Sequence, residues 1–175
     1  MRKSGIRIVL AMLVCGLVAA STGLQVLTLR DHDAIRFIRA VEPGETFLLK
    51  YLHSVSLTDV WERFAIGADD KLVLTETRFK GQGAGYPTDL SAGETLVREG
   101  GWFIITGMHR KIPLLYWRVQ TPWRNRIRFE SEPEIDLSRM VGEALILIQV
   151  EEMKAIAWAY HRLVLEIQNL MKARL

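Results

Sequence analysis

Short apolar runs separated by turn-forming residues fill most of this sequence. Between Leu24 and Glu151 these runs are rich in β-branched and aromatic residues, and Gly, Pro and Asp interrupt them at short intervals. The intervals leave no room for the helices that would connect parallel strands. The pattern therefore predicts a mainly β fold, either an antiparallel β-sandwich or a partly closed barrel.

Each expected strand is bounded by turn chemistry such as the Glu42-Pro43-Gly44 triplet. The acid-rich segment 131–142 contains Pro133 and is predicted to be a surface connection before the last strand. The expected strands cover residues 24–29, 34–41, 45–52, 59–66, 71–79, 95–98, 102–106, 114–119, 126–130 and 144–151.

The first residues have the composition of a targeting segment. Arg2, Lys3 and Arg7 precede an uncharged apolar run from Ile8 to Ala20. This run is shorter than the roughly 20 residues of a membrane-spanning helix. We therefore expect residues 1–21 to be a signal peptide, with an uncleaved membrane anchor as the alternative. Both alternatives place the β-rich domain, residues 22–152, in the periplasm or on the outer face of the cytoplasmic membrane.

Charge and cysteine content restrict the possible partners and cofactors. The chain has 23 basic and 20 acidic side chains, but three of the bases lie in the first 29 residues, so the remainder is formally neutral. The sequence therefore does not predict a nucleic-acid-binding protein. Cys15 is the single cysteine, which excludes a disulfide framework and a thiolate zinc site. No cofactor or metal is expected.

The C-terminal segment 153–175 follows a helical rather than a strand period. Its apolar residues recur at spacings of three and four, which predicts an amphipathic helix. Two interpretations remain open: the helix covers one face of the sheet, or it docks on a membrane partner or the lipid surface. The apolar positions are Met153, Ile156, Tyr160, Leu163, Ile167 and Leu170.

Two neighbouring expected strands each carry a carboxylate among apolar residues. Alternation puts Glu62 on one face with Phe64, and Glu76 on one face with Leu74 and Arg78. The simplest hairpin register then places Glu62 opposite Glu76, an arrangement that needs compensation because like charges repel.

Four interpretations of this polar cluster remain open. It could be a buried ion-pair network, a protonated acid, a divalent-cation site built from two carboxylates and an imidazole, or the product of a different register. The cluster comprises His53, Thr58, Glu62, Glu76 and Arg78.

Two further groups of residues are candidates for binding. Gly83, Ala84, Gly85 and Pro87 indicate a tight loop with close backbone approach rather than a phosphate cradle. The second candidate is a set of three arginines that alternate with other residues. This alternation predicts three guanidinium groups on one strand face, which can receive an anionic ligand or lipid head groups. The alternative is a solvated face balanced by nearby glutamates. This group is Arg124, Arg126 and Arg128.

The motifs Tyr51-x-His53-Ser54-Val55, Thr58-x-Val60-x-Glu62-x-Phe64, Glu76-Thr77-x-Phe79 and Gly83-Ala84-Gly85-x-Pro87 resemble the bacterial family of domains of unknown function called DUF1850. The resemblance extends over roughly Leu24 to Glu151. It implies an exported or membrane-anchored protein, often encoded beside permeases of tripartite ATP-independent periplasmic (TRAP) transporters of the TAXI type. It brings no established catalytic residues.

We therefore expect a non-catalytic accessory or binding domain that works with such a transporter permease. The C-terminal helix is a candidate docking element for the permease. Two alternatives stand beside this expectation. One is a periplasmic hydrolase or divalent-metal enzyme centred on His53, Glu62 and Glu76, and the other is a purely structural β module.

Overall fold

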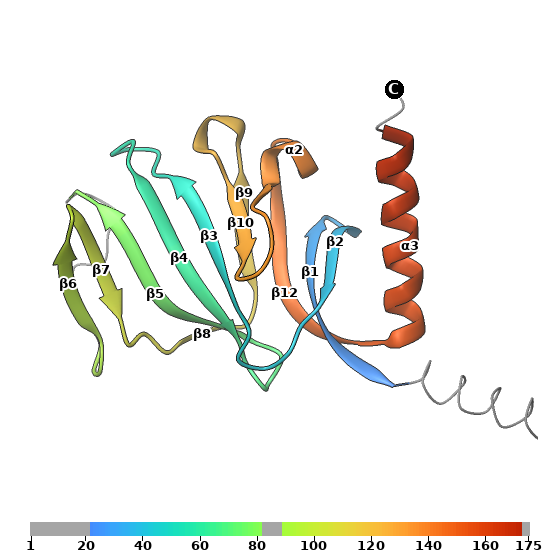
Figure 1. The fold of residues 1–175 in the computed structure, drawn as a ribbon, viewed down its shortest axis with the longest axis horizontal. Coiled ribbons are helices and arrows are strands. Elements are labelled where there is room, and N and C mark those ends of the chain that lie inside the picture. The colour runs from blue at the N-terminus through green and yellow to red at the C-terminus, as the bar shows by residue number, and fades with distance from the viewer. Residues whose placement is uncertain (1–21, 82–88, 173–175) are drawn as a thin grey trace, which may run out of the picture.

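Two antiparallel sheets form the protein, as the computed structural model shows for residues 22–81 and 89–172 (Figure 1). The smaller sheet has the strand order β2-β1-β12-β9, and the larger has the order β11-β10-β3-β4-β5-β7-β6, with β8 paired to β5. The smaller sheet contains β1 (Gly23–Asp31), β2 (Ala34–Ala40), β9 (Leu115–Val119) and β12 (Ala144–Lys154). The larger contains β3 (Thr46–Leu52), β4 (Asp59–Ile66), β5 (Leu72–Lys80), β6 (Thr95–Glu99), β7 (Trp102–Thr106), β8 (Arg110–Ile112), β10 (Arg126–Phe129) and β11 (Ile135–Asp136).

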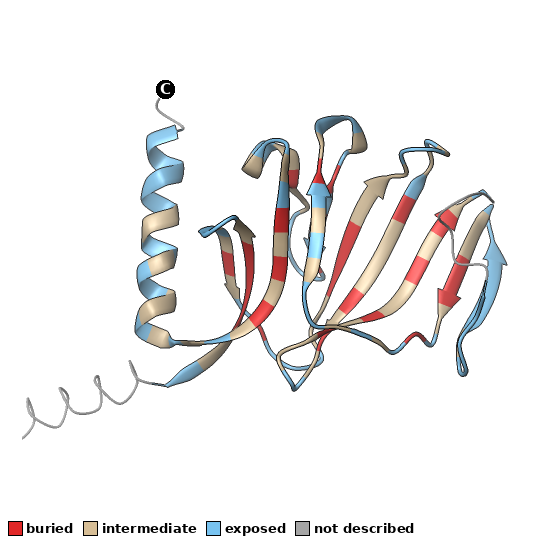
Figure 2. Ribbon diagram, turned by 180° about the vertical axis from the view of Figure 1, so that it is seen from behind, coloured by how far each residue is buried: buried red, intermediate tan, exposed pale blue. Residues whose placement is uncertain are grey.

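One hydrophobic core lies between the two sheets. Leu27 and Ile146 of the smaller sheet and Phe47, Leu49 and Phe64 of the larger are almost fully buried and belong to this core. Along the strands buried residues alternate with more exposed ones, because successive side chains point to opposite faces (Figure 2). The two sheets do not form a closed barrel, and the prediction of a mainly β, antiparallel fold is confirmed.

A β-bulge interrupts the pairing of β4 with β5. Phe64 pairs with Leu74, but the neighbouring Arg63 pairs with Glu76, so Thr75 is an extra residue on β5. The Thr75 hydroxyl donates a hydrogen bond of 3.1 Å to the Arg63 carbonyl oxygen. Beyond the bulge the alternation of β5 is reversed, and Thr77, not Glu76, is buried.

The segment 131–142 is more structured than the sequence predicts. It contains β11 and the short helix α2 (Leu137–Val141), and the side chain of Leu137 is fully buried. The Asp136 carboxylate caps α2 by accepting hydrogen bonds from the backbone N–H groups of Ser138 and Arg139. The prediction of a plain surface connection was therefore wrong for its second half.

The C-terminal helix α3 (Ala155–Lys172) stands at one end of the molecule, against the outer face of the smaller sheet (Figure 1). Its partly buried side chains include Trp158, Val164 and Leu165, whereas the predicted apolar stripe from Ile156 to Leu170 is exposed. Met153 belongs to β12 and pairs with Leu24. A helix is present as predicted, but the stripe does not cover the sheet.

Several predictions fall on residues that the structure does not describe. These are the signal peptide or anchor at residues 1–21 and the loop residues Gly83, Ala84, Gly85 and Pro87. Among residues 22–81 and 89–172, no helix has both the length and the apolar character needed to cross a membrane.

Candidate functional site

An open pocket of about 460 Å³ lies where the ends of β3 and β9 meet at the edge of the sandwich. Because β3 belongs to the larger sheet and β9 to the smaller, the pocket joins the two layers. Its volume is within the range of small-molecule sites. The lining residues are Tyr51, Leu52, His53, Ser54, Trp117, Arg118, Gln120, Trp123 and Asn125.

A buried asparagine holds the inner wall of this pocket. Asn125 is 2% exposed, and its Oδ1 accepts a hydrogen bond of 3.0 Å from Trp117 Nε1. Its Nδ2 donates to the carbonyl oxygen of Gln120, also at 3.0 Å. The Trp117 ring meets the ring of Tyr51 edge-on, with the centroids 5.1 Å apart. These contacts fix the orientation of the indole.

The outer aromatic wall comes from a 3₁₀ turn, Thr121–Trp123, in which Pro122 favours the turn conformation. Trp123 Nε1 donates a hydrogen bond of 2.6 Å to Gln120 Oε1. Both indole N–H groups are thus bonded within the protein, which leaves the rings available for stacking. Arg118 is exposed and forms no ion pair among the described residues, so it can receive an anion.

His53 is part of the tight loop, residues 53–58, that connects β3 to β4. Its Nδ1 accepts hydrogen bonds of 3.3 Å from the backbone N–H groups of Val55 and Ser56. The backbone N–H of His53 donates a hydrogen bond to the carbonyl oxygen of Thr58. The Thr58 hydroxyl in turn donates to the carbonyl oxygen of Lys80. His53 and Thr58 therefore lie together, as expected for the cluster, but Nδ1 of His53 is engaged in holding the loop.

The other members of the predicted cluster are separated by the sheet. Glu62 pairs with Thr77 instead of Glu76, because the bulge at Thr75 shifts the register by one residue. Glu76 lies on the opposite face, where it forms an ion pair of 2.6 Å with Arg78 and lies 3.9 Å from Arg63. The predicted meeting of Glu62 with Glu76 was wrong, and His53, Glu62 and Glu76 do not converge on one point.

Glu62 lies on the core face of β4, beside the buried side chains of Leu49 and Thr77 on the neighbouring strands. It forms no hydrogen bond or ion pair within the described part of the chain. Burial raises the pKa of Glu62 to about 7, because desolvation penalises the carboxylate. The geometry is consistent with the protonated-acid interpretation. Residues 22–81 and 89–172 contain no cluster of three His, Cys, Asp or Glu side chains arranged to hold a metal ion.

The predicted arginine face is only partly formed. Arg126 and Arg128 are exposed on one face of β10, but Arg124 ends the 3₁₀ turn in a left-handed conformation with φ of 47°. Arg126 forms an ion pair of 2.8 Å with Glu134, which also binds Lys50. Glu134 and Asp59 offset part of the positive charge in a neighbouring hollow of about 210 Å³.

Sequence reasoning did not single out this pocket. A usable signal was present, since Trp117, Gln120, Trp123 and Asn125 fall within nine residues around Pro122. What the sequence could not show is that Tyr51 and His53 reach the same place from a strand of the other sheet.

The fold and the pocket define an antiparallel two-sheet protein with an aromatic recess at one edge. Residues 47–137 match the family described as "Domain of unknown function (DUF1850)". The chain therefore belongs to the DUF1850 family, and the matched range contains the whole pocket and Glu62. Neither curated proteins nor solved structures gave a match.

We expect Glu62 to make stability depend on pH. Its folded pKa of about 7 exceeds the unfolded value of 4.5, so the folded state holds an extra proton between these values. The contribution of Glu62 to the free energy of unfolding should therefore be greatest below pH 4.5, fall as the pH rises to 7, and then level off. The loss attributable to Glu62 is about 3 kcal/mol at most.

Urea titrations between pH 4 and 8 measure this dependence. Glu62→Gln should remove the decrease that Glu62 causes between pH 4.5 and 7, and it should be more stable than the parent protein at pH 8. The matched control is Glu99→Gln, because Glu99 is an exposed glutamate at the end of β6. An unchanged pH profile in Glu62→Gln would show that the carboxyl is not desolvated.

We also expect His53 to stabilise the β3–β4 loop. His53→Ala removes the acceptor of two backbone N–H groups and should lower the free energy of unfolding by about 1–2 kcal/mol. His53→Asn should restore part of the loss, because an asparagine side chain can accept bonds from nearby backbone N–H groups. Chemical denaturation measures both variants, with the exposed neighbour Ser54→Ala as control. Equal stability of His53→Ala and the parent would contradict this role.

Proposed function

We propose that this protein is an exported, non-catalytic accessory domain at the outer face of the cytoplasmic membrane. In this role it binds a small solute and works with a TRAP transporter permease of the TAXI type. The observation that carries the binding role is the aromatic pocket, whose two indoles are held by internal hydrogen bonds.

The pocket chemistry favours an anionic solute with a flat or apolar face. Aromatic rings from Tyr51, Trp117 and Trp123 provide surfaces for stacking and apolar contact. Arg118 supplies a positive charge at the same pocket. A guanidinium group binds a carboxylate through paired hydrogen bonds, which would orient such a ligand against the rings.

Membership of the DUF1850 family supports the link to a transporter in one way: the resemblance implies that such proteins are often encoded beside TAXI-type TRAP permeases. The N-terminal cationic and apolar sequence supports export, because it has the composition of a signal peptide or anchor. A small solute-binding domain outside the membrane fits an accessory role in uptake.

Benzoate is a suitable first probe, because it combines a flat ring with a carboxylate, and benzamide is its neutral counterpart. We expect saturable quenching of tryptophan fluorescence by benzoate and at least about tenfold weaker binding of benzamide, reflecting the lost charge-assisted hydrogen bonds. Arg118→Gln should reduce benzoate affinity to a similar extent, and Trp123→Ala should also weaken it.

Trp102→Ala is the control for the loss of a tryptophan, since Trp102 packs against Trp61 away from the pocket. It should bind benzoate with the parent affinity. Equal affinity for benzoate and benzamide, or equal effects of Trp102→Ala and Trp123→Ala, would contradict an anion site in this pocket.

The transporter link is tested by purifying the tagged full chain from detergent-solubilised membranes. We expect a TAXI-type permease subunit, identified by mass spectrometry, to co-purify. An unrelated exported protein with the same leader and tag is the control. Absence of the permease from the eluate after mild cross-linking, or equal recovery with the control, would contradict the association.

A further inference from the structure

The helix α3 exposes a continuous apolar stripe, most of which faces away from the sandwich; Tyr160, at one border of the stripe, also lines a hollow between α3 and β2. The five side chains of the stripe recur at spacings of four and three, so they share one face of the helix. Each is 48–64% exposed, and Figure 1 shows α3 at the end of the molecule with no element beyond it among the described residues. The stripe consists of Ile156, Tyr160, Leu163, Ile167 and Leu170.

The opposite side of α3 packs on a polar part of the smaller sheet. There Glu151 accepts hydrogen bonds from Thr28 at 2.8 Å and from Arg30 at 2.7 Å. Two hollows, of about 350 Å³ and 260 Å³, remain between α3 and β2. Nε1 of Trp158 is buried and has no hydrogen-bond partner among the residues that the structure describes. The helix thus directs its most apolar face outward, which is the usual mark of an interaction surface.

The start of α3 is joined to the point where the N-terminal segment enters the domain. The backbone N–H of Ala155 donates a hydrogen bond of 2.9 Å to the carbonyl oxygen of Thr22. In the sequence, the apolar run predicted to enter the membrane ends at Ala20, two residues before Thr22. A membrane-inserted leader would therefore hold the first turn of α3 close to the lipid surface.

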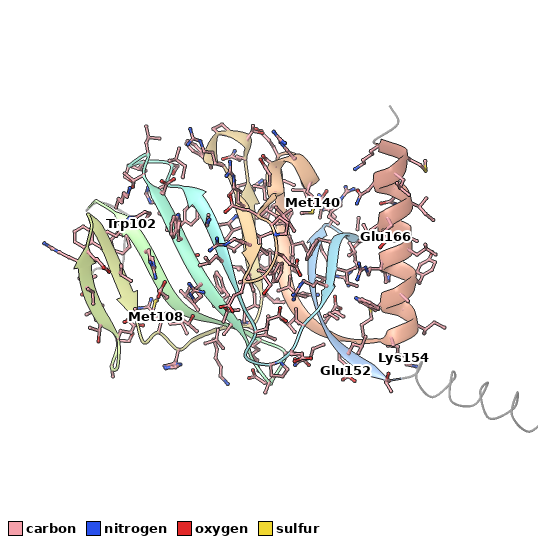
Figure 3. All side chains as sticks on the ribbon, viewed as in Figure 1. Trp102, Met108, Met140, Glu152, Lys154 and Glu166 are labelled. Atoms are coloured by element: carbon pink, nitrogen blue, oxygen red, sulfur yellow. The ribbon has the colours of Figure 1, made fainter. Side chains whose placement is uncertain are left out.

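The charges of α3 favour an anionic lipid surface over a second copy of the chain. Within α3, Arg162 forms an ion pair of 3.6 Å with the single acid Glu166. The basic side chains left for anionic head groups are Lys172 at the end of α3 and Lys154, the last residue of β12, immediately before it. Figure 3 shows Lys154 at the base of the helix and Glu166 farther along it.

In helical dimers, charged residues beside the apolar stripe commonly set the register of the two helices. The flanking positions are mostly uncharged: Ala157, Ala159, Val164, Glu166 and Met171.

We propose that α3 lies in the plane of the membrane interface, with its apolar stripe inserted at the level of the lipid head groups. Basic side chains near both ends then contact anionic head groups, and the sandwich is held with the smaller sheet toward the membrane. This inference depends on the proposed location at the outer face of the membrane, but not on solute binding in the pocket.

The experiment places an environment-sensitive fluorophore at a single cysteine in the full chain. Cys15→Ser removes the native thiol, and Leu163→Cys puts the label in the middle of the stripe. Val97→Cys is the matched control, because Val97 is an exposed apolar residue on β6, at the opposite end of the molecule from α3. The protein is reconstituted with vesicles of phosphatidylglycerol and phosphatidylcholine that contain nitroxide-labelled lipids.

We expect the label at residue 163 to be quenched at least about twofold more than the label at residue 97. Quenching should decrease in vesicles of phosphatidylcholine alone and in high salt. Adding the pair Ile156→Glu and Ile167→Glu should abolish it. Gln168→Glu with Asn169→Glu adds the same charge outside the stripe and should reduce quenching less.

Three results would overturn the proposal. The label at residue 163 could remain in water with every vesicle, become shielded without vesicles in a concentration-dependent manner, or become shielded only when a permease is present. The second result identifies a second copy as the partner, and the third identifies the permease. Benzoate binding is measured without lipid, so failure of the pocket and failure of membrane docking are distinguishable.

Discussion

The apolar contact between the two sheets is the interaction on which the other features depend. Leu27 and Ile146 on one side and Phe47, Leu49 and Phe64 on the other form a single core with little solvent access. Burial of this area is the main favourable contribution to folding, and it fixes which face of every strand points inward. Since β3 and β9 belong to different sheets, their ends meet only because the sheets pack together. The aromatic pocket is therefore a product of sheet packing.

One extra residue decides the chemistry of the larger sheet. Without the bulge at Thr75, Glu62 and Glu76 would lie opposite one another, and two carboxylates would share an apolar surface. The bulge turns Glu76 to the outer face, where it binds Arg78, and leaves Thr77 as the neighbour of Glu62. Like-charge repulsion is thereby avoided. The free-energy cost that remains is the desolvation of the Glu62 carboxyl group. Its raised pKa reflects burial without a compensating cation.

The pocket and the helix α3 differ in how their polar groups are satisfied. At the pocket, Asn125 and Gln120 satisfy the indole N–H groups of Trp117 and Trp123, so the aromatic rings are held in fixed positions. By contrast, α3 packs on polar strand residues, and within the described part of the chain the indole N–H of Trp158 has no hydrogen-bond partner. A pre-organised pocket suits ligand binding, because little ordering is needed when the ligand arrives. A loosely seated amphipathic helix suits contact with a surface outside the fold.

The sequence by itself determined most of the strand positions, the antiparallel class and the C-terminal helix, because alternation, turn residues and helical spacing are local properties. The short strands β8 and β11 were not predicted. The sequence also carried the motifs by which the family is recognised. Only the tertiary structure decided which side chains meet. Thr75 carries no local sign of a bulge, yet it separates Glu62 from Glu76; Trp117 and Tyr51 are distant in the chain, yet their rings touch. The outward direction of the α3 stripe was likewise undetermined, because periodicity defines a helical face without stating what that face contacts.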